Sequence, residues 1–219
     1  MKAVIYHADA HRARKWSHFS YEGLIKGMKE NLNSYGIELI HLTLDGFPGY
    51  GDTNFFYPDL NPEEIIYNRE VCFTKFLKHH AEDNEQYWFT EADVRLRNPF
   101  PLLKEGVDAA FIVAFTEQRF LPTWRLAKKS ATPIFEEALS KFTGLKKWDG
   151  DSEAWAEVYI AVGRPGDNQQ ISYNNMRFET RQYKPYNMTK SHYTAHYKAK
   201  HKQFILDNNH LFINPEYKK

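Results

Sequence analysis

Apolar and polar positions repeat with two different periods along the chain, and the alternation of the two predicts the order of the secondary-structure elements. The chain opens with a short apolar run at 3–6, which is typical of a central strand. Residues 20–35 carry apolar side chains at helical spacing, and Gly36 is well placed to end that helix. The pattern over 38–44 then predicts a second strand.

The middle of the chain continues this alternation. Residues 45–62 are rich in Gly, Pro, Asp and Asn, which predicts a long loop. Asn61-Pro62-Glu63-Glu64 is expected to open a helix, with the proline in its first turn and the acids complementing the helix dipole. Short apolar runs at 87–89 and 109–115 predict buried strands, and the second run is continuous enough to be buried on both faces.

The second half of the chain begins with helical patterns and ends without a clear period. A short helical piece is predicted at 101–105, and longer helices are predicted at 133–142 and 151–159. A last short strand is expected at 159–162. From residue 163 onward the chain is polar, aromatic and basic, and no element is predicted there.

This order of elements predicts an α/β fold with a mostly parallel sheet flanked by helices. The chain of 219 residues fits a single domain, 1–219, in which 163–219 forms a polar C-terminal extension or lid. Charged residues make up 26% of the chain and nearly balance at a formal net charge of +1, so no overall basic field points to a nucleic-acid coat protein. The lone Cys72 rules out an intrachain disulfide, and no apolar run is long enough for a signal peptide or a membrane span. We therefore expect a soluble, cytoplasmic protein.

Two acidic residues follow the predicted strand at 87–89. Glu91 and Asp93 are separated only by Ala92, and a turn at 98–99 comes soon after. Side chains two positions apart on an extended chain point the same way, toward the edge where open α/β sheets bind their ligands. Carboxylates are the ligands that Mg²⁺ and Mn²⁺ prefer, and such an ion often also holds a diphosphate. The pair predicts a metal site, and the alternative is two solvated acids at a strand end.

Four motifs occur in a recognisable order: V-I-Y-H-A-D-A at 4–10, F-T-E-A-D-V-R-L-R-N-P-F at 89–100, W-D-G-D-S-E-A-W at 148–155 and H-Y-K-A-K at 196–200. In this order they resemble the small glycosyltransferases of the GT-A fold, the nucleotide-diphospho-sugar transferases, including a virus-encoded type. The second motif is similar to the family's strand with a D-x-D metal motif, and the fourth resembles its late H-F-x-G-x-x-K element. The first acid of the metal motif is Glu91 rather than Asp, and the late element lacks its glycine.

The resemblance implies transfer of a sugar from a nucleotide-diphosphate sugar, with UDP as the nucleotide, to a hydroxyl acceptor. Mn²⁺ or Mg²⁺ would stabilise the leaving diphosphate and would be held by Glu91, Asp93 and His196. His196 and Lys200 would share a face if their segment were helical. The implied donor-binding residues lie near the first strand, on the helix before the metal motif and in the late element: Tyr6, His7, Ala8, Asp9, Arg69, Glu91 and Lys200.

The candidate catalytic groups are two carboxylates, Asp149 and Asp151, on either side of Gly150. Either one could act as general base for the acceptor hydroxyl or could orient the acceptor. Asp151 is equally well placed to cap a helix. Whether the anomeric configuration is retained or inverted does not follow from these residues.

The acceptor and two rival functions stay open. The basic stretches at 7–15 and 190–202 would suit modified DNA, the acceptor of a virus-encoded base-modifying transferase, while a saccharide or lipid-linked acceptor fits the same motifs. A metal-dependent nucleotidyltransferase is a rival, although it usually has a glycine-rich phosphate loop and 7–15 contains no glycine. The other rival is a nucleic-acid-binding protein that uses the basic aromatic tail.

Overall fold

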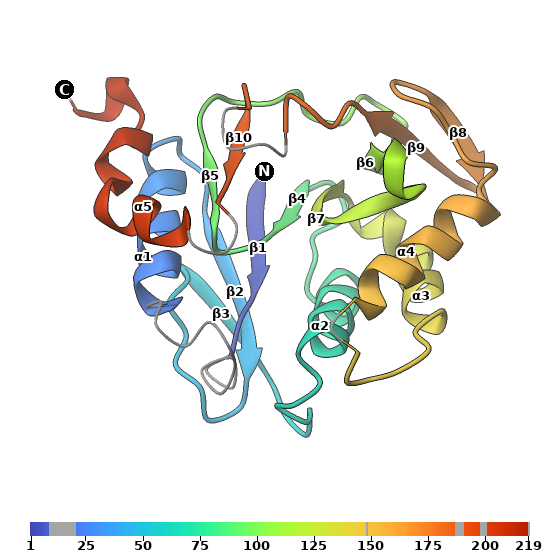
Figure 1. Ribbon diagram of the computed structural model, residues 1–219, viewed down its shortest axis with the longest axis horizontal. Helices are drawn as coiled ribbons and strands as arrows, with labels where there is room; N and C mark the ends of the chain where they lie inside the picture. Colours follow the sequence, from blue (N-terminus) through green and yellow to red (C-terminus); the bar gives the residue numbers. More distant parts are fainter. Residues whose placement is uncertain (9–20, 148, 187–190, 198–200, 219) are drawn as a thin grey trace.

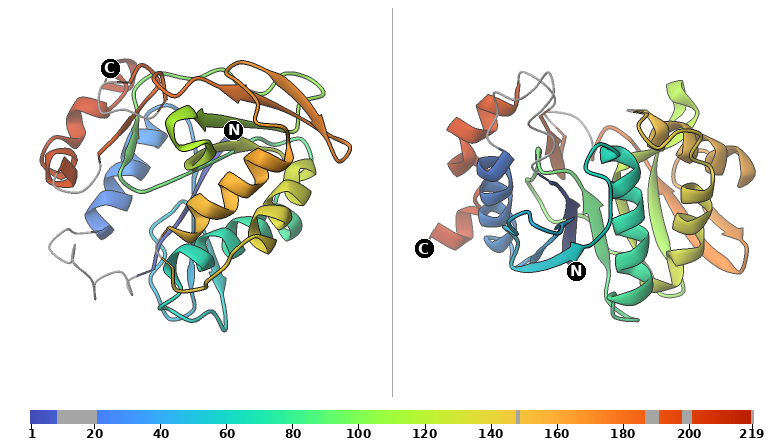
Figure 2. Two further views of the ribbon diagram at one scale, coloured as in Figure 1. Left: turned by 45° about the vertical axis from the view of Figure 1, so that its right-hand side comes forward. Right: turned by 90° about the horizontal axis from the view of Figure 1, so that it is seen from below.

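A computed structural model describes residues 1–8, 21–147, 149–186, 191–197 and 201–218. An eight-stranded sheet lies at its centre, in the order β3-β2-β1-β4-β7-β6-β9-β8 (Figure 1). Helices cover both faces of this sheet, as the two further views in Figure 2 show. Among the described residues, no helix combines the length and the apolar character needed to span a membrane.

The first half of the sheet is parallel. β1 pairs with both β2 and β4, so that Val4 lies opposite Ile40 on one side and Phe89 on the other. β3 continues the parallel order at the outer edge. The bounds of these strands are Lys2–Tyr6 for β1, Leu39–Leu44 for β2, Thr53–Tyr57 for β3 and Tyr87–Thr90 for β4.

The second half of the sheet is mixed, because β7 lies antiparallel between β4 and β6. β9 then pairs parallel with β6, and β8 forms an antiparallel hairpin with β9 at the other edge. The bounds are Ala109–Ala114 for β6, Arg119–Ala127 for β7, Gln170–Tyr173 for β8 and Met176–Arg181 for β9.

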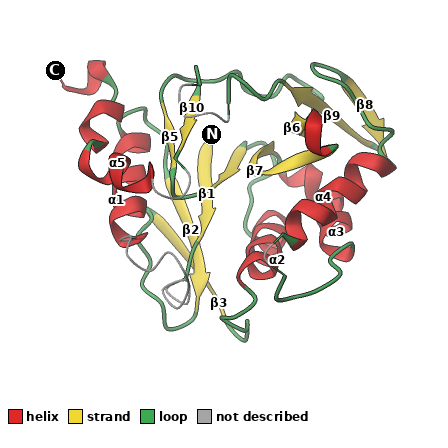
Figure 3. Cartoon of the chain, in the orientation of Figure 1, coloured by secondary structure: helices red, strands yellow, loops and turns green. Residues whose placement is uncertain are grey.

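Helices lie on both faces of the sheet (Figure 3), and each face has its own apolar core. Helices α2, α3 and α4 pack on one face, and α1 and α5 pack on the other with a small antiparallel sheet of β5 and β10. The helices are α1 (Tyr21–Asn33), α2 (Ile65–His79), α3 (Thr132–Ser140), α4 (Gly150–Ala161) and α5 (Lys202–Asp207). The small strands are β5 (Val94–Leu96) and β10 (Thr194–His196), and short 3-10 turns lie at Phe115–Glu117, Lys129–Ala131, Asn209–Phe212 and Pro215–Lys218.

The predicted α/β fold class is confirmed, and strands β1, β2, β4 and β6 and helices α1 to α4 lie close to their predicted positions. Three local predictions are wrong. The predicted loop at 45–62 contains β3, an edge strand flanked by turn formers, in which Tyr57 is buried, Phe55 is half-buried and Phe56 is exposed. The piece at 101–105 is not helical. The apolar run at 159–162 continues α4 instead of forming a strand, because so short a run has no period that separates the two.

Two further differences concern helix starts and the tail. α2 begins at Ile65, so Pro62 lies in the turn before the helix and not in its first turn. The tail beyond residue 163 contains β8, β9, β10 and α5, which no periodic pattern had predicted. β8 and β9 extend the main sheet, while β10 and α5 belong to the layer that covers its other face.

Candidate functional site

A pocket of about 420 Å³ lies beyond the carboxyl ends of β1 and β4, where α/β sheets bind ligands. Its wall combines residues that are far apart in the sequence. Tyr6 and His7 follow β1, Glu91 follows β4, and other lining residues come from the starts of α1, α2, α4 and α5, from β7 and from the end of β10.

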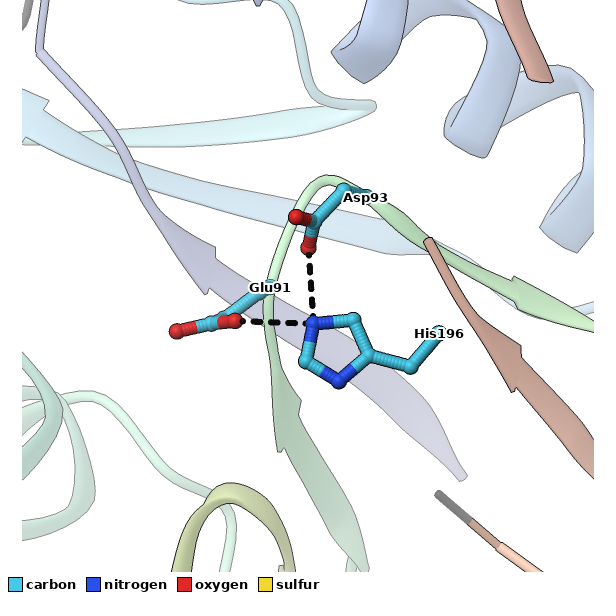
Figure 4. Close-up of side chains that lie close together, drawn as sticks. All are labelled: Glu91, Asp93 and His196. Atoms are coloured by element: carbon cyan, nitrogen blue, oxygen red, sulfur yellow. Dashed lines mark ion pairs between the residues drawn. The ribbon is translucent and has the colours of Figure 1, made fainter. Parts of the chain in front are cut away.

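Glu91, Asp93 and His196 converge in this pocket (Figure 4), and one ligand atom from each lies within 4.8 Å of the others. Nε2 of His196 is 3.3 Å from Oε2 of Glu91 and 3.3 Å from Oδ1 of Asp93. The backbone explains this convergence. The two acids lie in the turn between β4 and β5, and the pairing of β10 with β5 places His196 opposite Val94.

The charges of these three groups are mutually dependent. Burial alone would lower the pKa of His196, but the carboxylates of Asp93 and Glu91 raise it to about 9. Burial would raise the pKa of Asp93, but the positive charges of His196 and Lys202 hold it well below its usual range. The pKa of Glu91 is lowered against burial by a hydrogen bond from His196 and by the charge of Arg69. The imidazolium of His196 therefore offsets part of the negative charge of the acidic pair, and Lys202 and Arg69 are its other cationic neighbours.

Lys202 is the cation next to this group, with Nζ 3.1 Å from Oδ2 of Asp93 and 5.0 Å from the centroid of the Tyr21 ring. The sequence predicted Lys200 for this role, and Lys200 lies outside the described residues. The shared helix face that would join His196 to Lys200 has no basis at its first residue, because His196 ends strand β10. Lys202 begins α5, and only the fold brings it to Asp93.

Arg69 joins three elements on the opposite side of Glu91. Its Nη1 donates to Oε1 of Glu91 at 2.6 Å, and its Nη2 forms an ion pair with Oδ2 of Asp151. The second oxygen of Asp151 accepts a hydrogen bond from the backbone N–H of Ser152 at 2.7 Å. Burial raises the pKa of Asp151 although the charge of Arg69 opposes the shift. Arg69 thus holds the end of β4 and the start of α4 in fixed relation to α2.

A buried ion pair lies beneath Arg69. The carboxylate of Glu70 accepts hydrogen bonds from Nη1 and Nη2 of Arg125 at 2.5 and 2.9 Å, and a third from Nε1 of Trp155 at 3.2 Å. The Arg125 guanidinium lies 5.0 to 5.3 Å from the ring centroids of Phe73, Phe135 and Trp155. These contacts connect α2, β7, α3 and α4 directly behind the pocket.

The structure brings most of the predicted site residues to the pocket. The lining includes eight of them: Tyr6, His7, Arg69, Glu91, Asp93, Asp149, Asp151 and His196. Ala8 is buried next to them but does not line the pocket, and Asp9 lies outside the described residues. Asp149 is exposed at the start of α4, and its side chain does not cap the helix.

The lining also includes four residues that the sequence had not identified as site candidates: Tyr21, Arg119, Thr123 and Lys202. Tyr21 stacks on the His7 ring with 4.3 Å between the centroids, so two elements supply adjacent aromatic faces. Arg119 and Thr123 lie on β7, a strand that the hydrophobic pattern did not predict. Neither residue could be predicted without knowing that β7 lies next to β4 in the sheet.

Comparisons with known proteins bear on the fold. No protein family model matches the chain, and no curated protein matches its sequence. Among solved structures, a glycosyltransferase involved in the glycosylation of the major capsid of PBCV-1 superposes with a TM-score of 0.56 at 12% identity, covering 96% of this chain and 98% of that one. The chain has a GT-A-like glycosyltransferase fold. An active-site mutant of LgtC shares this fold, with a TM-score of 0.52 at 10% identity over 100% of this chain and 99% of the other.

The GT-A-like fold agrees with the order of motifs in the sequence. In this chain the E-A-D motif at 91–93 lies in the turn between β4 and β5 and the late histidine ends β10, and the fold joins them at one pocket. At identities of 10 to 12% the likeness establishes the fold, and the function has to be argued from the site itself.

Proposed function

We propose that this protein is a metal-dependent glycosyltransferase that moves a sugar from a UDP-sugar to a hydroxyl acceptor. The observation that carries the proposal is the convergence of Glu91, Asp93 and His196 beside Lys202 in the pocket of a GT-A-like fold. Two carboxylates and a cation at one point suit the recognition of a metal-bound diphosphate. The glycosyltransferases that share the fold support the same reaction class.

The donor set fits a divalent ion. Carboxylate oxygens suit Mg²⁺ and Mn²⁺, and an imidazole ligand favours the transition metal, so Mn²⁺ is the better match to Glu91, Asp93 and His196. The bound ion would neutralise the charge that develops on the diphosphate as it leaves. His196 must be neutral to act as a ligand, so metal binding has to release the proton that the acidic pair otherwise stabilises.

Other pocket residues would bind the phosphate and the base of the donor and orient the metal ligands. Lys202 supplies a point charge for a phosphate oxygen, and burial against Asp93 and Tyr21 keeps the ammonium in place. Tyr21 and His7 offer aromatic surface beside the end of β1, where a uracil base would bind. Arg69 keeps Glu91 oriented toward the metal position.

The two candidate catalytic carboxylates have different environments. Both oxygens of Asp151 are engaged, by Arg69 and by the backbone of Ser152, so we assign Asp151 to positioning. Asp149 is exposed on the pocket wall one residue before α4. We assign Asp149 to accept the proton of the acceptor hydroxyl.

The rival functions have less support from the site. A nucleotidyltransferase uses two metal ions, whereas within the described ranges a single group of three metal-ligating side chains is found. A nucleic-acid-binding tail would need aromatic rings that bases can stack on. The tail residues Tyr186, Tyr197 and Phe212 are buried in the core on the face of the sheet that α1 covers, whereas Phe204 is exposed.

Thermal denaturation with UDP and UDP-sugars, each with and without Mn²⁺, tests this proposal. Binding to the native state raises the midpoint according to ligand concentration over affinity. We expect UDP to raise the midpoint only when Mn²⁺ is present, and Asp93→Asn to abolish the shift. A control variant, Asp83→Asn, changes an exposed acid outside the pocket and should leave the shift intact. A metal-independent shift that survives Asp93→Asn would contradict the proposal.

A further inference from the structure

We infer that the acceptor is an acidic glycoside, a hydroxyl compound whose carboxylate or phosphate group binds Arg119 on β7. The inference rests on the proposed function and names the substrate class for the part of the pocket that the metal and diphosphate do not use.

The pocket has a second wall apart from the metal group. β7 contributes Arg119, Leu121, Pro122 and Thr123 to it, and α4 contributes Ser152. α4 lies on the opposite side of β1 from α5, which carries Lys202 (Figures 1 and 2). Apolar side chains between polar ones are typical of sites that bind the face of a ring and the groups at its edge. This second wall therefore suits an acceptor sugar.

Three permanent cations line the pocket in the described parts of the chain, and they differ in their partners. Arg69 is held by Glu91 and Asp151, and Lys202 by Asp93. Arg119 forms its ion pair with Glu117, whose side chain is 53% exposed and does not line the pocket. Exposed ion pairs contribute little to stability, because water and salt screen them. A ligand anion shielded by the pocket can therefore compete for Arg119 far more easily than for Arg69 or Lys202.

Two buried polar atoms on β7 also indicate that a ligand binds at this wall. Nε of Arg119 and Oγ1 of Thr123 are both buried, and neither has a hydrogen-bond partner among the residues that the structure describes. Buried polar groups in native proteins are nearly always paired. Arg119 and Thr123 flank Leu121 and Pro122, so an acceptor lying on this apolar surface would place oxygen atoms at both ends.

Arg119 binds the acceptor and takes no part in the bond changes. In the transfer, the acceptor hydroxyl oxygen forms a bond to the anomeric carbon of the donor sugar. The bond from that carbon to the diphosphate oxygen breaks, and its electron pair leaves with UDP. The hydroxyl proton goes to a base, for which Asp149 is the assigned group. The acidic substituent of the acceptor is unchanged in the product.

The test uses the full chain with Mn²⁺, a set of UDP-sugars, and pairs of acceptors in which one member carries an anionic group and the other is neutral. One pair is methyl β-glucuronide and its methyl ester, and the other is methyl β-glucoside 6-phosphate and methyl β-glucoside. UDP release and product mass give kcat/KM for each acceptor. We expect the acid of at least one pair to exceed its neutral partner by about 10- to 100-fold, the range of a charge-assisted hydrogen bond. Which pair shows the difference distinguishes a carboxylate from a phosphate.

Two variants should move this preference in opposite directions. Arg119→Gln should bring the acid and neutral acceptors to similar kcat/KM values, with partial rescue by Arg119→Lys. Glu117→Gln removes the competing carboxylate, so it should lower KM for the acid and leave the neutral acceptor unaffected. The midpoint shift with UDP and Mn²⁺ shows that each variant is folded.

Equal or better use of the neutral acceptors overturns the inference, as does an acid preference that survives Arg119→Gln. So does a wild-type protein that binds UDP-sugar with Mn²⁺ but uses neither acid. Failure of the proposed function is a different result, in which the wild-type protein neither binds UDP with Mn²⁺ nor releases UDP from any donor.

Discussion

Arg95 donates a hydrogen bond from Nη1 to the backbone carbonyl of Ala92 at 2.9 Å, and Ala92 is the residue between Glu91 and Asp93. The Arg95 guanidinium is fully buried and also donates to the carbonyl of Val94 at 3.0 Å, to α1 and to the C-terminal segment. Nη2 donates to the carbonyl of Leu24 at 3.0 Å, and Nε donates to Oδ1 of Asn209 at 2.9 Å. Burial lowers the pKa of Arg95 to about 10. Arg95 thus fixes the turn that carries two metal ligands to two distant parts of the chain, α1 and the C-terminal segment.

Replacing Arg95 should therefore weaken the metal site. Arg95→Lys keeps the positive charge but cannot reach Ala92, Leu24 and Asn209 together. Loss of residues that orient metal ligands usually costs about 10- to 100-fold in metal affinity, and we expect a change in this range. Calorimetric titration of Mn²⁺ into the protein with saturating UDP measures it.

Arg97→Lys is the matched control for this change. Arg97 directly follows β5 and is partly exposed, and among the described residues its side chain donates a hydrogen bond only to the carbonyl of Ser191, at 3.5 Å. Its replacement should leave Mn²⁺ affinity unchanged. Equal affinities for the Arg95 and Arg97 variants would show that the turn does not depend on Arg95.

Metal binding should depend on pH through His196. Because Asp93 and Glu91 raise the pKa of this imidazole to about 9, it is protonated at pH 7, and only the neutral form can bind an ion. Apparent Mn²⁺ affinity should therefore rise about tenfold per pH unit between pH 6 and 8 and level off above the pKa. Calorimetry in buffers with different ionisation enthalpies should detect the release of about one proton per ion. An affinity independent of pH, with no proton released, would argue against His196 as a ligand.

The Glu70–Arg125 pair should be essential for stability. Glu70→Gln would leave the Arg125 guanidinium charged and unpaired among aromatic rings. Breaking a buried ion pair in this way costs about 3 to 5 kcal/mol in the free energy of unfolding. Lys78→Ala, which breaks the exposed pair of Lys78 with Glu136, should cost less than about 1 kcal/mol. Urea denaturation measures both, and similar losses for the two variants would contradict the role of the buried pair.

The site divides into a part that local sequence encodes and a part that the fold creates. Glu91 and Asp93 follow directly from a recognisable strand, so their common direction could be predicted. His196 could be proposed as a ligand only from the motif resemblance, because its place in the site depends on the pairing of β10 with β5. Lys202 and Arg119 could not be predicted, because no pattern in the sequence relates α5 or β7 to Glu91 and Asp93.

The missed strand β7 shows why the remainder of the fold was not predictable. Its sequence, R-F-L-P-T-W-R-L-A, contains a proline and two arginines, which are unusual in a central strand. Arg125 is accommodated by Glu70 on α2, a partner 55 positions away in the chain. The antiparallel insertion of β7 between β4 and β6 therefore depends on a tertiary ion pair that no pattern within the strand reveals.

The proposed metal-dependent transfer is best tested by measuring UDP formation with Mn²⁺ and with EDTA. The donors are UDP-glucose, UDP-galactose and UDP-N-acetylglucosamine. We predict that at least one donor gives UDP only when Mn²⁺ is present. Asp93→Asn should lower that rate by on the order of 100-fold, because the charge on the leaving diphosphate loses its stabilisation. UDP formation that is unaffected by EDTA and by Asp93→Asn would contradict a metal-dependent transferase.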